Sequence, residues 1–120
     1  MEGLVISIKN AASGLRLILR QERNARIHLA LAIAALAAGL LLGVSDIGLA
    51  AMFFAVILVF LAEIFNSAIE KTLDLVEPTV SVKVAEVKDM AAGGVLVAAI
   101  AAAAIGAVVL LPKLTGWTWL

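Results

Sequence analysis

Three long apolar runs constrain the fold of this chain more than any other feature of its sequence. They cover residues 27–44, 47–62 and 90–111. A helix needs about 20 apolar residues to cross the hydrocarbon core of a bilayer, so each run is a candidate transmembrane segment. Hydrophobic residues make up 64% of the chain, compared with about 45–50% in a typical soluble domain. The sequence therefore predicts an all-α membrane protein.

The segment before the first run, residues 4–26, has the pattern of an amphipathic helix lying on the membrane surface. Its apolar face comprises Leu4, Ile8, Ala11, Leu15, Ile18 and Leu19, and its polar face comprises Lys9, Ser13, Arg16, Arg20 and Arg23. The simplest interpretation is a lipid anchor, and the alternative is that the polar face helps to build a site. Glu22 is the acid among the arginines, and an i,i+4 salt bridge to Arg26 is its default explanation.

A polar stripe interrupts the second apolar run at residues 62–74, which read AEIFNSAIEKTLD. At about 100° of rotation per residue, the other polar side chains of the stripe fall within roughly 60° of Glu63 on the helix surface. They are Asn66, Ser67, Glu70 and Asp74. Three carboxylates and an amide thus share one face, while the rest of the helix stays apolar for packing.

Glu63 is expected at or just inside the membrane boundary. The apolar residues 47–62 before it cover roughly 24 Å at about 1.5 Å per residue, less than the thickness of the hydrocarbon core. An ionisable residue at that depth is by default a functional candidate, although a helix–helix hydrogen bond or salt bridge would also explain a single acid. His28 lies near the start of the first span and is interpreted as an interfacial hydrogen-bonding residue rather than a metal ligand.

We expect residues 1–120 to form one integral membrane domain, with a surface helix and three transmembrane helices. The expected bounds are 4–26 for the surface helix and 27–44, 47–70 and 90–111 for the spans. Glu77 and Pro78 should end the second span, and a polar connection should follow as far as Asp89. Small residues in the third span favour close helix packing. Pro112, Lys113, Trp117 and Trp119 resemble interface anchors.

The lysines and arginines predict the orientation of the chain. They precede the first span and recur between the second and third, whereas Lys113 falls on the opposite side. By the positive-inside rule, the N-terminus and the connection at 71–89 are cytoplasmic, and the C-terminus is outside. The polar residues that could then meet at the inner leaflet of the cell membrane are Glu22, Glu63, Asn66, Glu70, Asp74, Lys88 and Asp89.

Such a group suits phosphoryl transfer. Carboxylates can hold Mg²⁺ and bridge it to phosphates, a lysine suits phosphate as a point charge, and an acid at the boundary can act as a general base. The sequence has no Walker-A motif, no cysteine, and a net charge of zero that gives no reason to expect nucleic acid. A carboxylate-lined cation pore, a transporter subunit and a structural scaffold are the alternatives. A pore or transporter should carry polar residues through the whole membrane depth, and these spans are apolar in their outer halves.

The residues EIFNSAIEKTLD at 63–74 and KDMAAGGVL at 88–96 resemble the prokaryotic diacylglycerol kinase/undecaprenol kinase family of small integral membrane lipid kinases. Order and spacing fit over nearly the whole chain. The resemblance implies a homotrimeric helical bundle with shared active sites that use Mg-ATP. It also implies that Glu63 is the general base for a lipid hydroxyl and that Asn66 supports it. By the same resemblance, Glu22 and Glu70 bind Mg²⁺ and nucleotide phosphates, and Lys88, Asp89 and Asp74 complete the nucleotide site.

Within the family, ERNARIH at 22–28 and LPKL at 111–114 look more like the undecaprenol kinases, which favours undecaprenol over diacylglycerol as the lipid substrate. Two positions depart from the family pattern. Val80 and Ser81 stand where relatives often carry Tyr-His, which bears on the nucleotide contacts of that loop. Gly94 stands where an alanine is usual, and this exchange of one small residue for another should matter little.

Overall fold

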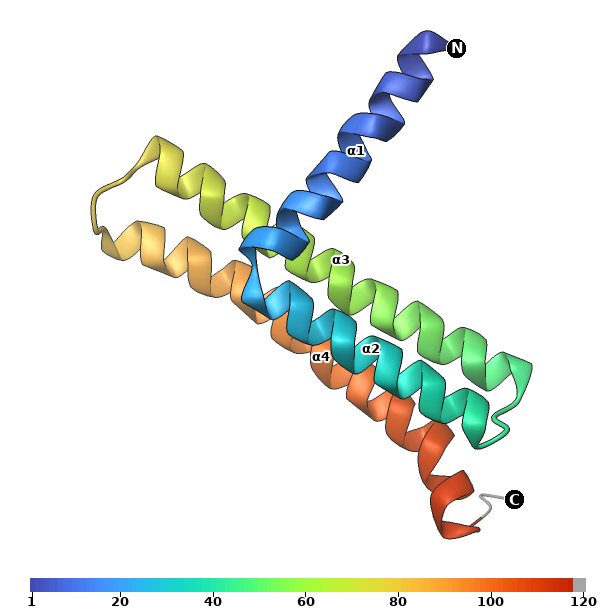
Figure 1. Ribbon diagram of the computed structural model, residues 1–120. Helices are drawn as coiled ribbons and strands as arrows, with labels where there is room; N and C mark the ends of the chain where they lie inside the picture. Colours follow the sequence, from blue (N-terminus) through green and yellow to red (C-terminus); the bar gives the residue numbers. More distant parts are fainter. Residues whose placement is uncertain (118–120) are drawn as a thin grey trace.

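The computed structural model describes residues 1–117 and is helical almost throughout this range (Figure 1). It contains four helices in the described part of the chain: α1 (Glu2–Gln21), α2 (Arg23–Leu41), α3 (Asp46–Val76) and α4 (Val82–Thr115). Helices α2, α3 and α4 are each long and apolar enough to cross a membrane. The prediction of an all-α membrane protein is confirmed.

Helices α2, α3 and α4 lie side by side as a bundle, and α1 projects away from it as a separate arm (Figure 1). Helix α3 packs most extensively against α4 and next against α2. Its 31 residues and the 34 of α4 span about 46 and 51 Å at about 1.5 Å per residue, well beyond a hydrocarbon core of about 30 Å. The end at which α3 and α4 extend beyond α2 therefore reaches into water.

The surface helix ends earlier than expected, at Gln21 rather than at residue 26, and the first span begins at Arg23 rather than at residue 27. The break is Glu22, which has an extended backbone with φ −103° and ψ 113°. The apolar run marks the part of α2 that fits the bilayer, but backbone hydrogen bonding continues into the charged residues before it. The same helix ends at Leu41 rather than at residue 44.

The tight connection between α2 and α3 depends on small and polar residues. Gly43 has φ +67°, a left-handed conformation that suits glycine at the end of a helix. Ser45 then caps α3 by accepting a hydrogen bond from the Gly48 backbone N–H at 3.1 Å. Gly39 lies where the two helices approach closely, because a Cβ there would lie 3.0 Å from Leu49 Cδ2. These features hold α2 and α3 as an antiparallel pair.

The connection between α3 and α4 is much shorter than the predicted polar segment. Helix α3 runs to Val76 rather than to residue 70, and it ends before Pro78, as the sequence indicated. Helix α4 starts at Val82 rather than at residue 90 and continues through Pro112. It ends only where Gly116 adopts φ +69°. The polar residues at these positions end the apolar runs, but α3 and α4 continue through them, because a helix outside the bilayer can be polar.

Few side chains are buried within one chain. The buried apolar residues are Ile18, Ala25, Val44, Met52, Ala55 and Val59, and α4 buries none of its residues. Most of the apolar surface of the bundle is exposed, as a protein in lipid allows. Three polar residues of α3 are nevertheless buried, and they mark the candidate site. Trp117 is exposed, and Trp119 lies outside the described residues.

Candidate active site

The buried polar residues are Glu63, Asn66 and Ser67, whose exposed fractions are 2%, 8% and 1%. All three belong to the polar stripe predicted on α3. Burial of a polar group costs free energy unless the group is hydrogen-bonded or paired. Within residues 1–117, Asn66 Oδ1 and Ser67 Oγ have no hydrogen-bond partner. Burial of these polar groups therefore costs free energy that helix packing alone does not explain.

Glu63 and Asn66 line a hollow of about 260 Å³ between three helices. Helix α2 contributes Asn24 and His28, and α4 contributes Ala92, Val95, Leu96 and Ala99. The small side chains of Ala92 and Ala99 on α4 leave room for this hollow. The alanine-rich sequence of the third span thus provides space for a site. A glutamate and an asparagine thus line one cavity whose wall on α4 is apolar, an arrangement that can receive a hydroxyl group.

His28 meets Glu63 across this hollow. Its Nε2 atom lies 3.8 Å from Glu63 Oε2, and the side chains are 23% and 3% exposed. His28 was predicted to be an interfacial hydrogen-bonding residue and was not among the predicted site residues. A signal was present in the sequence, because His28 and Glu63 both lie at the polar ends of neighbouring apolar runs.

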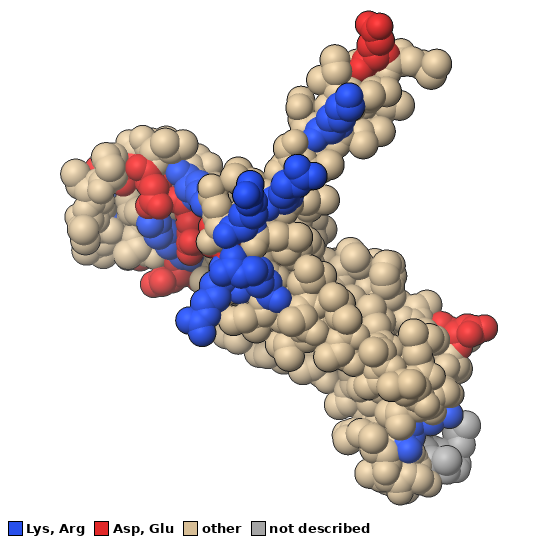
Figure 2. Space-filling view, in the orientation of Figure 1, with Lys and Arg blue, Asp and Glu red and all other residues tan. Residues whose placement is uncertain are grey.

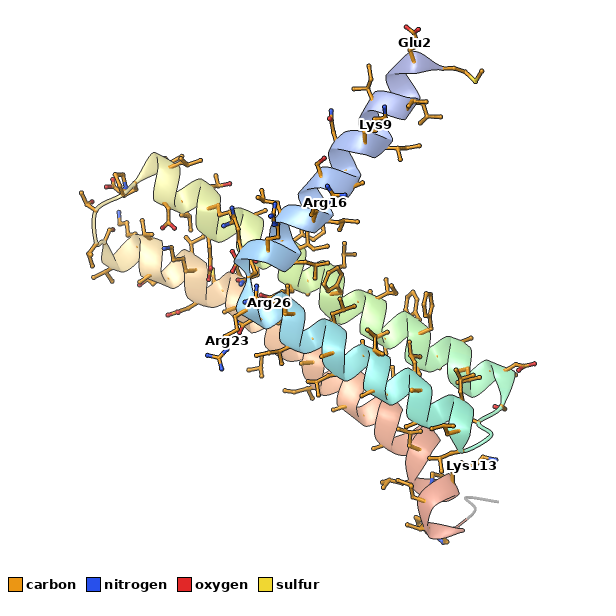
Figure 3. The ribbon with its side chains drawn as sticks, viewed as in Figure 1. Glu2, Lys9, Arg16, Arg23, Arg26 and Lys113 are labelled. Atoms are coloured by element: carbon orange, nitrogen blue, oxygen red, sulfur yellow. The ribbon has the colours of Figure 1, made fainter. Side chains whose placement is uncertain are left out.

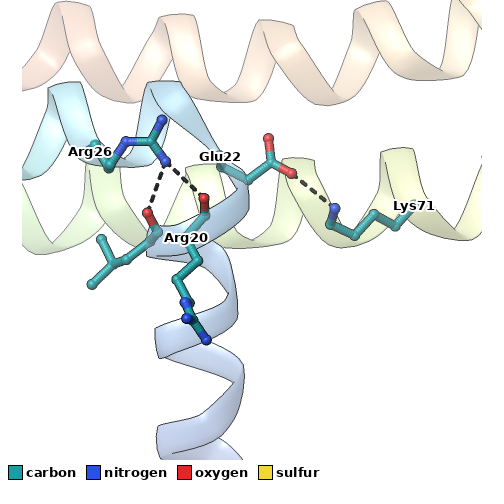
Figure 4. A network of polar contacts seen from close by, with 5 residues as sticks. Arg20, Glu22, Arg26 and Lys71 are labelled. Atoms are coloured by element: carbon teal, nitrogen blue, oxygen red, sulfur yellow. Dashed lines mark hydrogen bonds and ion pairs between the residues drawn. The ribbon is translucent and has the colours of Figure 1, made fainter.

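Glu22 has a different partner from the one expected. Lys71 Nζ of α3 lies 3.0 Å from Glu22 Oε1, so the i,i+4 salt bridge to Arg26 is wrong (Figure 4). Arg26 instead donates to the backbone carbonyls of Leu19 and Arg20 at 3.0 and 3.1 Å. Because the helix breaks at Glu22, its side chain turns toward α3, while Arg26 satisfies carbonyls at the end of α1.

The remaining predicted residues lie at the water-exposed end of α3 and α4. Lys88 Nζ donates a hydrogen bond of 2.6 Å to Asp74 Oδ1, which joins the two helices. Glu70 is half-buried and close enough to act electrostatically on both Glu63 and Lys88. Asp89 is exposed. The structure thus pairs two of the predicted residues, Asp74 and Lys88, and it pairs Glu63 and Glu22 with residues that were not predicted, His28 and Lys71. Glu70 lies along α3 between Glu63 and Asp74.

The described residues form no group of three or more histidine or acidic side chains around one point. The carboxylates of Glu22 and Glu70 are both near enough to Glu63 to act on it electrostatically. Mg²⁺ is commonly held by one or two carboxylates, with phosphates and water as its other ligands. A pair of carboxylates at the wet edge of the site fits that chemistry.

Charge is gathered at the end of the bundle that carries this site. Figure 2 shows the basic side chains where α1 joins the bundle, acidic and basic side chains on the extension of α3 and α4, and an uncharged surface between there and the opposite end. Arg23 and Arg26 lie at the start of α2, and Lys113 lies at the far end of α4 (Figure 3). The uncharged surface is the part that suits the bilayer core.

Comparison with known proteins shows the family of this chain. The family described as prokaryotic diacylglycerol kinase matches residues 9–110. This chain belongs to that family. A diacylglycerol kinase of Synechocystis sp. (strain ATCC 27184 / PCC 6803 / Kazusa) is 37% identical over 112 residues, which are 92% of this chain and 64% of that protein. An undecaprenol kinase of Bacillus subtilis (strain 168) is 37% identical over 108 residues, which are 90% of this chain and 88% of that protein.

The family resemblance predicted from residues 63–74 and 88–96 is confirmed, and with it the enzyme class of the family, a lipid kinase. The chain spans less than two thirds of the length of the Synechocystis relative. The two relatives carry different substrate names at the same identity, 37%. Overall similarity therefore does not separate the two lipids.

Proposed function

We propose that this protein transfers the γ-phosphoryl group of Mg-ATP to the hydroxyl group of a membrane lipid alcohol, undecaprenol. The observation that carries the proposal is Glu63, a carboxylate with an exposed fraction of 2% that lines a hollow with apolar residues of α4. A carboxylate in such a place can take a proton from a hydroxyl group delivered from the bilayer. Membership of the prokaryotic diacylglycerol kinase family supports the same reaction class.

A groove beside the hollow supports a lipid substrate. It has a volume of about 340 Å³ and lies between α2, α3 and α4. His28 and Ala99 line both the groove and the hollow, so the two spaces adjoin. The groove runs toward Ala35 and Gly106, deeper along the apolar part of the helices, and its walls are almost entirely apolar. We assign it to the hydrocarbon chain of the lipid, which would bring the lipid hydroxyl to Glu63.

In the proposed reaction, Glu63 accepts the proton of the lipid hydroxyl and Asn66 holds that hydroxyl in place. A bond forms between the lipid oxygen and the γ-phosphorus. The bond from the γ-phosphorus to the bridging oxygen breaks, and ADP leaves with that oxygen. Water then takes the proton from Glu63. Phosphoryl transfer needs little else from a protein than positioning and charge stabilisation.

The exposed end of the site would bind the nucleotide. Glu22 and Glu70 are the proposed Mg²⁺ ligands, and Lys88 is the proposed phosphate contact. The exposed acids Asp74 and Asp89 would complete the nucleotide site. Bound Mg²⁺ neutralises charge on the phosphates. Lys88 already spans from α4 to Asp74 on α3, so the two helices that would hold ATP are tied together beside Glu70.

We further propose that the N-terminus and the site are cytoplasmic, that the C-terminus is outside, and that the protein is a homotrimer with shared active sites. The gathering of Lys and Arg at the end that carries the site supports the orientation (Figure 2). The resemblance is the ground for the trimer. The exposed apolar surface of α4, which buries none of its residues in one chain, leaves a face on which a second copy can pack.

The choice of undecaprenol over diacylglycerol rests on the sequence at 22–28 and 111–114. The decisive experiment gives the purified protein in lipid nanodiscs ATP labelled at the γ-phosphate, Mg²⁺ and either undecaprenol or diacylglycerol. We expect faster transfer of label to undecaprenol. Faster transfer to diacylglycerol would reverse the substrate assignment, and no transfer to either lipid would overturn the proposed activity.

A further inference from the structure

We propose that His28 is a positioning residue for Glu63, which the family-based site does not include. This inference rests on the proposed function, because His28 would be a partner on another helix for the general base of that reaction. The feature that suggests it is the approach of the imidazole and the carboxylate, 3.8 Å apart, across the hollow that also contains Asn66.

The position of His28 singles it out among the residues around the site. It lines the hollow with Glu63 and also the apolar grooves on both sides of α2. The imidazole therefore stands where a polar cavity opens into spaces suited to hydrocarbon. A lipid whose chain lies in the larger groove would bring its hydroxyl group past this side chain before reaching Glu63.

The charges near Glu63 explain why it needs a partner. Glu22 and Glu70 are carboxylates whose negative charges act on Glu63, and the imidazole of His28 offers a ring N–H that can stabilise the Glu63 carboxylate. The side chains that α4 contributes to the hollow are apolar and provide no competing partner. Asn24 and Asn66 also line the hollow, but among the described residues the side chain within ion-pair range of the Glu63 carboxylate is His28, at 3.8 Å. The imidazole is therefore the group placed to hold that carboxylate in a fixed orientation.

The distance of 3.8 Å is longer than a hydrogen bond and within the range of an ion pair. Catalytic hydrogen bonds are often long in the absence of substrate and shorten in the reacting complex. In the role we propose, His28 Nε2 donates to Glu63 Oε2. The other carboxylate oxygen then faces the hydroxyl in the hollow and takes its proton. His28 itself gains and loses no proton in the transfer.

Kinetics of two His28 variants test this role. His28→Leu removes the donor, and misplacing a reacting group by about 1 Å can lower the rate about 100-fold. We expect kcat to fall by that order while the KM for Mg-ATP stays unchanged. His28→Gln keeps an N–H donor near the position of Nε2 and should restore most of kcat. Leu40→Ala, an exposed change at the far end of α2, is the matched control and should behave like the wild type.

A second measurement does not depend on kinase activity. The chain contains one histidine, so protein labelled with ¹⁵N-histidine in nanodiscs gives NMR signals from a single imidazole. We expect Glu63→Gln to shift those signals. Glu86→Gln, an exposed change on α4, should leave them in place.

Each outcome decides the proposal. Imidazole signals that ignore Glu63→Gln would overturn the contact, and wild-type kcat in His28→Leu would overturn the role. Equal loss in His28→Leu and His28→Gln would also overturn it, because a donor would then be irrelevant. If the wild type phosphorylates no lipid, the proposed function fails and the positioning role fails with it, and the NMR result separately reports whether the pair exists.

Discussion

Glu63 and Asp74 belong to the same face of the same helix, yet their surroundings are opposite. Glu63 is buried and faces a cavity and a histidine. The side chain of Asp74, three turns further along α3, is 65% exposed and bound to a lysine of α4. The two carboxylates therefore differ in exposure, because the bundle encloses one end of the polar stripe and leaves the other end in water. The buried end suits proton transfer, and the exposed end suits ions and phosphates.

The strongest test of this contrast is Glu63→Gln. The amide keeps the shape of the side chain but cannot act as a base, and loss of a general base costs about 10²- to 10⁴-fold in rate. We expect kcat for lipid phosphorylation to fall by that amount while nucleotide binding is retained, as measured by ATP titration of the variant. The midpoint of thermal unfolding should stay the same or rise, because a buried acid is replaced by a neutral group. Wild-type turnover would remove Glu63 as the base.

Glu70 lies between the buried end of the stripe at Glu63 and its exposed end at Asp74, and we expect its role to resemble that of the exposed end. Glu70→Gln removes the charge of a proposed Mg²⁺ ligand, and even loss of the group that hydrogen-bonds a metal ligand lowers metal affinity by about 10- to 100-fold. The KM for Mg-ATP should therefore rise by about 10- to 100-fold. Steady-state assays at varied Mg²⁺ and ATP would measure it, with Glu86→Gln as the control. An unchanged KM with a reduced kcat would instead group Glu70 with Glu63.

Asp74→Asn should have a smaller effect of the same kind. Exposed ion pairs contribute little because solvent screens them, so the change in affinity should be about fivefold or less. We expect a modest rise in the KM for Mg-ATP and no measurable change in the midpoint of thermal unfolding. A large loss of thermal stability would mean that the exposed end has a structural role that its surroundings do not suggest.

Lys71→Met tests the joint between α1 and the bundle and should have the smallest effect. The Lys71 side chain is 44% exposed and its partner Glu22 is 24% exposed, so solvent screens the pair and its contribution is at the low end of about 0.2–1 kcal/mol. Thermal unfolding in detergent should show a slight loss of stability. Lys83→Met, an exposed change near the start of α4, is the control. A loss as large as that of a core substitution would contradict the weak, screened pair.

The helical class, the polar stripe and the stop at Pro78 could be predicted because they depend on local patterns. Apolar runs mark spans, and helical spacing places Glu63 and Asn66 on one face. The helix ends at Val76 and Val82 could not be predicted from hydropathy, because an apolar run reports the fit to the bilayer whereas the helix continues into water. Hydropathy and backbone hydrogen bonding are separate properties, so the end of an apolar run does not mark the end of a helix.

Contacts between side chains on different helices also could not be predicted from the sequence. The pairing of Glu22 with Lys71 requires the break between α1 and α2 and the rotation of α3 that turns Lys71 toward it. The approach of His28 to Glu63 depends on how α2 and α3 pack, and Gly39 allows this packing to be close. Spacing within one helix says nothing about either contact. The residues of the candidate site could thus be named individually, but not assigned to pairs.

The unbroken length of α3 sets the tolerance of this chain to insertions and deletions. One residue inserted between Glu63 and Glu70 would rotate everything after it by about 100° and would carry the exposed acids off the face they share with Glu63. The same insertion at residues 77–81, where the structure has no helix, would disturb neither end. The chain should therefore tolerate insertions and deletions in that connection and should not tolerate them between Glu63 and Asp74 in α3.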